Sequence, residues 1–252
     1  MFSRLLAGSR GRADSFLSGG WLLPGLAALL VLPLPGCQKP VPREGGIADL
    51  APLAIAPGAR HFRLQSVQSQ LTVLVYRDGR LANLGHNHVI SSDDLHGEIY
   101  LADTLLNSAF EIRLPVTTMV VDAPQNRANA GDDFPGELDP DAISGTRANM
   151  LGEQQLHAEM WPEIVLRSRV MRGVLPDYTV QVDIAVRSAI YALEIPLHVL
   201  VTGDRIVATG SFSVNQTDLG LEPFSVMMGA LKVRDQLDIK FSLVAKADGP
   251  AI

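Results

Sequence analysis

Cysteine is nearly absent from this 252-residue chain, in which Cys37 is the only one. A single cysteine excludes an intramolecular disulfide and a metal site built from several thiolates. Aromatic residues are also scarce, at 6% of the chain against 47% for all hydrophobic residues. Aliphatic side chains must therefore fill most of the core, and a folded domain of this chain depends on that core for its stability.

Basic residues are the minority among the charged ones, with 21 Lys and Arg against 27 Asp and Glu. Residues 1–37 contain three Arg and one Asp, so the remainder carries 18 basic and 26 acidic residues and a formal net charge of −8. Binding to a phosphate backbone requires clustered basic side chains, so no nucleic-acid partner is expected.

Several catalytic motifs are missing as well. The chain has no Gly-x-Ser-x-Gly nucleophile elbow, no phosphate-binding glycine loop and no dinucleotide fingerprint. Acidic residues fall mostly in loops or on the polar sides of strands, where solvated surface positions are the usual interpretation. We therefore expect a protein that is not an enzyme, with no catalytic residue and no cofactor.

The N-terminal region has an apolar run from Trp21 to Leu34, too short to span a bilayer, which takes about 20 residues in a helix. Arginines precede the run, and Leu34-Pro35-Gly36-Cys37 follows it, an order typical of a secretory signal. This segment resembles a bacterial lipoprotein signal. The resemblance implies cleavage before Cys37 and acylation of its thiol; an uncleaved hydrophobic anchor is the alternative. Gln38 after the cysteine favours the outer membrane, with the protein facing the periplasm.

Residues 38–60 are rich in proline and glycine, which predicts an extended tether. From residue 61 to 246 the dominant pattern is alternation of apolar and polar residues, the signature of strands with one buried face. Eight strand-like segments are expected: Val67–Tyr76, Leu95–Leu101, Phe110–Val116, Ile164–Met171, Val180–Val186, Ala192–Val199, Ile206–Val214 and Gln236–Leu243. Residues 247–252 are then a short tail.

Turn signals indicate how these strands connect. Asp78-Gly79 and Gly203-Asp204 suit tight turns between antiparallel neighbours. Eight strands with one apolar face each can bury those faces only as a sandwich or a closed barrel. The prediction is an all-β fold.

One helix is expected to interrupt the strands. Asp139 can cap it, Pro140 suits its first turn, and Gly152 ends it. Before it, residues 122–136 are polar and predict a long loop. A loop and helix in the middle of a β-domain would lie over one end, where they could act as a lid. The Met227-Met228 segment is either a loop that closes on the core or the mouth of a cavity.

His86 and His88 form the most suggestive polar pair. On a strand they project from the same face and could share a metal ion, although a third ligand is not evident from the sequence. Hydrogen-bonding histidines at a barrel end are the alternative, and a physiological metal is the less favoured of the two.

Four segments together resemble the YceI-like family of exported lipid-binding proteins. They are Gly85–Val89 with Leu95–Ile99, the helix from Asp139 to Leu151, Met160–Ser168, and Leu219–Leu221 with Leu231–Ile239. The resemblance implies an eight-stranded, antiparallel, lipocalin-like barrel that holds a long isoprenoid or similar amphiphile. The candidate lumen residues are the inward apolar positions of the strands: Phe110, Ile112, Leu114, Ile164, Leu166, Val182, Ile184, Leu193, Ile195, Phe212, Ile239 and Phe241.

The leading hypothesis is thus an envelope lipoprotein that binds an apolar lipid, of isoprenoid or quinone type, for transport or storage. Its expected partners are that lipid and the membrane reached through the acyl anchor, and a homodimer is left open. Two alternatives are a metal- or redox-linked site at His86 and His88, and a structural envelope protein whose barrel is filled by side chains.

Overall fold

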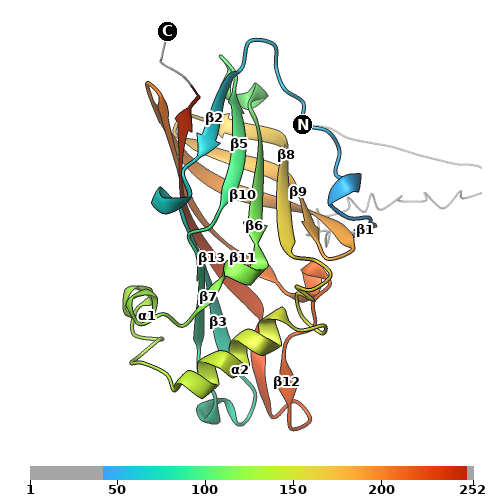
Figure 1. Cartoon of the computed structure of the whole chain (residues 1–252), viewed down its shortest axis with the longest axis vertical. Helices are drawn as coiled ribbons and strands as arrows, with labels where there is room; N and C mark the ends of the chain where they lie inside the picture. Colours follow the sequence, from blue (N-terminus) through green and yellow to red (C-terminus); the bar gives the residue numbers. More distant parts are fainter. Residues whose placement is uncertain (1–41, 249–252) are drawn as a thin grey trace, which may run out of the picture. The chain divides into compact units, whose positions relative to one another are not determined.

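The computed structural model describes residues 42–248, and Cys37 with its signal segment lies outside the described residues. The strands form a closed antiparallel barrel (Figure 1). Their bounds are β2 (Arg60–Leu64), β3 (Gln70–Asp78), β4 (His88–Ser92), β5 (His96–Leu101), β6 (Ala109–Pro115), β7 (Val120–Val121), β8 (Glu163–Val174), β9 (Asp177–Val186), β10 (Ala189–Thr202), β11 (Arg205–Asn215), β12 (Ser225–Val226) and β13 (Leu231–Ala247).

Eight strands close the ring in the order β10, β9, β8, β6, β5, β2, β13 and β11, because β11 pairs with both β13 and β10. β13 is long enough to pair along one edge with β3 and then with β2. β4 pairs with β3 and β5 with β2, so β4 and β5 together occupy the next position of the ring. β7 pairs with β4 and β6 with β5, so β6 and β7 share the position after that. The expected eight-stranded all-β barrel is confirmed, with three of its positions divided between two consecutive strands.

Local sequence accounts for the connections. Gly203 has φ +58°, which suits the two-residue turn between β10 and β11, as expected. Gly79 also has a positive φ, of +94°, but there the chain continues through residues 79–87 before β4 begins. Asp78-Gly79 therefore starts a longer connection rather than a tight hairpin.

The expected helix is α2 (Pro140–Leu151). The Asp139 carboxylate accepts a hydrogen bond from the Asp141 backbone N–H, and Gly152 is the C-cap, both as the sequence predicts. Ile143, Met150 and Leu151 pack on the hydrophobic cluster at this end of the barrel. α2 therefore covers one end of the lumen (Figure 1).

The long loop expected over residues 122–136 contains a second helix, α1 (Pro124–Ala130). The expectation of a single helix was therefore wrong. Its sequence, Pro-Gln-Asn-Arg-Ala-Asn-Ala, has no apolar stripe, so pattern analysis does not detect it. Arg127 is a residue of α1, and its buried side chain holds the helix in place instead.

Part of the segment expected to be a free tether lies against the barrel. β1 (Arg43–Glu44) pairs with β10, and a short 3-10 helix spans Ile47–Asp49. Leu50 is buried in a cluster with Val165 and Ile190. An apolar side chain that can reach a sheet gains by burial, which offsets the extended preference of the surrounding prolines.

Candidate functional site

The barrel encloses an apolar cavity of about 340 Å³, within the range of roughly 300–1,000 Å³ found for small-molecule sites. Thirty-two residues line it, and only five of these have polar side chains. The cavity occupies the α2 end, since α2 contributes Thr146, Asn149 and Met150 to its wall. At another part of the barrel the lumen is filled by a cluster around Phe62, Tyr178 and Val199. The barrel is therefore filled in part and hollow in part.

Ten of the twelve predicted lumen residues border this cavity: Phe110, Ile112, Leu114, Ile164, Leu166, Ile184, Ile195, Phe212, Ile239 and Phe241. Strand register explains why they meet. Ile112 is paired with Leu166, and Leu166 with Ile184, so inward side chains form a continuous row across β6, β8 and β9. Whether these residues contact a ligand stays a prediction.

Val182 and Leu193 are not among the lining residues. They are directly paired across β9 and β10, and Val182 is completely buried in a cluster with Val180 and Ile195. Phe110 and Phe212 pack on this cluster. Val182 and Leu193 both occupy inward positions, as the alternation predicts, but neighbouring side chains separate them from the cavity.

Sequence reasoning missed the contribution of β3 and β4, which place Leu71, Val73, Val75 and Ile90 on the cavity. The strand β3 was expected, but its run Leu-Thr-Val-Leu-Val-Tyr is apolar on both faces. Leu74 is buried on the opposite face, in a cluster with Val89 and Phe134. Because the segment after α1 covers that outer face, alternation alone does not show which face is the inner one.

The Met227-Met228 segment lies at the surface. Met227 is 61% exposed and Met228 fully exposed, and both adopt a left-handed backbone conformation with φ near +54°. Nearby, Phe224 borders the cavity while remaining 37% exposed. Met227 and Met228 do not line the cavity themselves, and their exposure does not match a loop that closes on the core.

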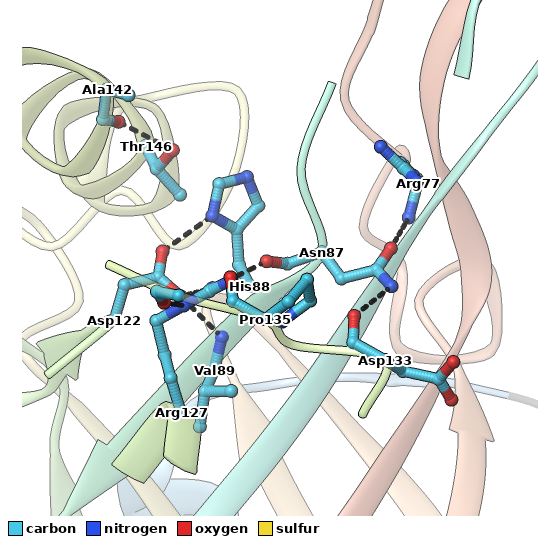
Figure 2. Close-up of polar contacts among 11 residues, drawn as sticks. Arg77, Asn87, His88, Val89, Asp122, Arg127, Asp133, Pro135, Ala142 and Thr146 are labelled. Atoms are coloured by element: carbon cyan, nitrogen blue, oxygen red, sulfur yellow. Dashed lines mark hydrogen bonds and ion pairs between the residues drawn. The ribbon is translucent and has the colours of Figure 1, made fainter. Parts of the chain in front are cut away.

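A buried polar cluster lies at the same end (Figure 2). His88 is the first residue of β4, and its Nδ1 is 2.6 Å from Oδ2 of Asp122. The other oxygen of Asp122 accepts hydrogen bonds from the Val89 backbone N–H and from Arg127 Nη1. The Asp122 side chain is 0% exposed, that of Arg127 2% and that of His88 14%.

Burial alone would raise the pKa of the Asp122 carboxyl, since a charge is costly away from water. Hydrogen bonds from His88, the Val89 N–H and Arg127 outweigh this effect and hold the pKa below its usual value. The carboxylate is therefore ionised. Arg127 also donates to the backbone carbonyls of Gly136, Asn87 and Pro135, so the same guanidinium fixes the segment after α1.

Of the two candidate metal ligands, His88 is on the cavity wall and His86 precedes β4, with ring centroids 6.5 Å apart. Within residues 42–248, no three His, Cys, Asp or Glu side chains lie close enough to hold a metal ion. Nδ1 of His88 is occupied by its hydrogen bond to Asp122. The pair therefore has neither a third ligand in this part of the chain nor two free imidazoles.

Neither helix in the described part of the chain is long and apolar enough to cross a membrane. A scan against protein-family models finds no match, and a search of curated proteins finds none either.

Solved structures do match the fold. BcnA of Burkholderia cenocepacia aligns with a TM-score of 0.53 at 12% identity, over 73% of this chain and 99% of that one. A polyisoprenoid binding domain from Saccharophagus degradans, implicated in plant cell wall breakdown, aligns with a TM-score of 0.50 at 14% identity, over 74% and 98%. A YceI protein of Campylobacter jejuni aligns with a TM-score of 0.45 at 5% identity, over 62% and 82%. The first two matches show that the chain shares its fold with BcnA and with a polyisoprenoid binding domain, in agreement with the barrel that the sequence resemblance implies.

Proposed function

We propose that the barrel binds one long apolar lipid, of isoprenoid or quinone type, in the cavity under α2, and that it transports or stores this lipid in the cell envelope. The observation that carries the proposal is the chemistry of the cavity wall, where 27 of the 32 lining side chains are apolar. The name of the Saccharophagus degradans domain, which shares the fold, points to the same ligand class.

The energetics suit such a ligand. Each methylene removed from water contributes about 0.8 kcal/mol, so a chain of several isoprene units gains enough affinity without any ionic contact. The aliphatic wall provides shape and exclusion of water. The proposed role is binding rather than catalysis, in keeping with the name of the Saccharophagus degradans binding domain.

The proposal also includes the location of the protein in the cell. An acyl group on Cys37 would hold the protein at the membrane that contains its lipid, facing the periplasm, with the outer membrane favoured by Gln38. Cys37→Ala tests this part, because the variant should leave the membrane fraction and appear in the soluble envelope fraction. Equal membrane retention of both proteins would contradict acylation as the anchor.

Lipid binding is tested by titrating the purified protein with a fluorescent apolar probe and displacing it with isoprenoids of increasing chain length. We expect the probe to bind at one saturable site. Longer isoprenoids should displace it at lower concentrations, up to the chain length that the cavity can hold. A protein that takes up no probe after its native lipid has been extracted would contradict the proposal.

A further inference from the structure

His88 differs from three of the four other polar residues of the cavity wall. Three of the five have a side-chain donor engaged: Thr146 Oγ1 donates to the Ala142 carbonyl, Gln155 Nε2 to that of Glu222, and Gln216 Nε2 to that of Arg234. Asn149, on α2, is the fourth, and its side chain makes no hydrogen bond among the described residues. His88 is the fifth, and only its Nδ1 takes part in a hydrogen bond among the described residues. Its Nε2 has no partner among them, and His88 borders the cavity.

The network behind His88 fixes which nitrogen carries the proton. An ionised carboxylate can only accept hydrogen bonds, so the 2.6 Å contact with Asp122 requires a proton on Nδ1. In the neutral ring Nε2 then has a lone pair and no hydrogen. Figure 2 shows the ring turned so that this nitrogen points away from Asp122.

Asp122 and Arg127 balance each other's charge without His88. The single negative charge of Asp122 is already matched by Arg127, whose Nη1 lies 2.6 Å from Oδ1. The wall around the His88 ring is apolar and includes Val75, its register partner on β3, and Met119. An unpaired charge is costly in such surroundings.

We propose that Nε2 of His88 accepts a hydrogen bond from the hydroxyl of a lipid alcohol, so that the cavity selects chains ending in an O–H donor, such as a polyprenol or a quinol. This inference rests on the proposed lipid-binding function and specifies its head group. Asp122 and Arg127 act as positioning residues, which hold the ring in the accepting tautomer. A ketone, quinone or ether head group can only accept hydrogen bonds and gains nothing from this nitrogen.

The test compares geranylgeraniol with its methyl ether, which keeps the chain and the oxygen but lacks the O–H. Competition against a fluorescent apolar probe at pH 8, where histidine is ordinarily neutral, gives the two dissociation constants. The alcohol should bind about three- to tenfold more tightly, the net effect of one hydrogen bond. Equal affinities in the wild-type protein overturn the assignment, while failure of both ligands to bind overturns the proposed function itself.

His88→Phe keeps a ring at this position and removes Nε2. Its alcohol-to-ether ratio should fall to about one, while affinity for the ether remains. His198→Phe is the matched control outside the cavity, because Nδ1 of His198 also lies at hydrogen-bond distance, 2.9 Å, from a carboxylate, that of Asp177, while the side chain is exposed. Its ratio should stay at the wild-type value. A ratio that persists in His88→Phe assigns the head-group contact elsewhere, with Asn149 the first residue to examine, and overturns the proposal.

If His88→Phe does not fold, as judged by its thermal unfolding transition, the ratio of the wild-type protein still decides whether a donor is preferred. Asp122→Asn then supplies the second variant. Its side-chain amide can donate to Nδ1, which frees the ring to carry its proton on Nε2, and the preference for the alcohol should weaken or reverse. An unchanged ratio there contradicts the positioning role of Asp122.

Discussion

Asp122 and Arg127 form an ion pair with side-chain exposures of only 0% and 2%. Replacement of Arg127 by Met, which has a similar length, leaves the carboxylate buried without its cation. We expect the free energy of unfolding to fall by about 3–5 kcal/mol, as for other broken buried pairs, in urea denaturation.

Arg172→Met is the control, because Arg172 and its partner Glu194 are 69% and 60% exposed. That change should cost less than about 1 kcal/mol. Similar losses in both variants would show that the buried pair has no special structural role.

The lowered pKa of Asp122 predicts a pH dependence of stability. The Asp122 carboxyl of the folded protein stays ionised to a lower pH than the same carboxyl in the unfolded chain, where its pKa is about 3.9. The stabilisation is therefore complete above that value and is lost as the pH falls through the folded pKa. In Asp122→Asn this contribution is absent, so the difference in unfolding free energy between wild type and variant should shrink between pH 6 and 3. A constant difference over that range contradicts the assignment.

Sequence could indicate the lumen residues but not this cluster. Inward apolar positions follow from alternation along one strand, and ten of twelve such residues reach the cavity. Asp122 begins a polar stretch that reads as a solvated loop, and its partner His88 is 34 residues away. Only the pairing of β4 with β7 brings the ends of these segments together.

At the scale of elements, two adjacent residues of β13 test whether the ligand occupies the cavity, because one faces the lumen and the other faces away from it. Ile239 borders the cavity, and the adjacent Lys240 is exposed on the opposite face of the same strand. Ile239→Trp should fill part of the 340 Å³ space and lower affinity for long isoprenoids at least tenfold, with an overpacking cost of about 1–3 kcal/mol.

Lys240→Trp adds the same side chain outside the barrel and should leave lipid affinity unchanged in the same titration. Loss of binding in both variants, or in neither, would mean that the ligand does not occupy this cavity.

Replacement of Gly145 in helix α2 should stabilise the protein. A Cβ added there meets nothing within 4 Å, and the backbone is helical. Gly145→Ala should therefore raise the unfolding free energy by about 0.5–1 kcal/mol through reduced backbone entropy of the unfolded chain, measured by thermal or urea unfolding.

Gly210→Ala is the contrasting change, since its Cβ would lie 2.4 Å from the Pro196 carbonyl oxygen and 2.5 Å from the Phe241 ring. It should destabilise the barrel. A stabilised Gly210→Ala, or a destabilised Gly145→Ala, would contradict the packing described for β11 and α2.

The elements also show where sequence patterns are sufficient. Strands with one buried face, such as β9 and β10, and the capped helix α2 follow from alternation and capping residues. β2 and β4 are only five residues long, and α1 is polar, so none of the three has a distinct periodicity. Their conformations depend on pairing and on the buried Arg127 rather than on local preference.

At the scale of the whole molecule, one chain contains both a proposed acylation site at Cys37 and a barrel with an apolar cavity. The net charge of −8 beyond residue 37 gives the protein no electrostatic attraction to anionic lipid, so membrane contact would depend on the acyl chain. Lipid extracted from the protein is then the most direct record of its function.

The decisive measurement is organic extraction of the full-length protein, purified from its native membrane, followed by mass spectrometry of the extract. We predict about one long-chain lipid per protein, ending in a hydroxyl, and its loss from Ile239→Trp. An extract without stoichiometric lipid from the wild-type protein would contradict the account.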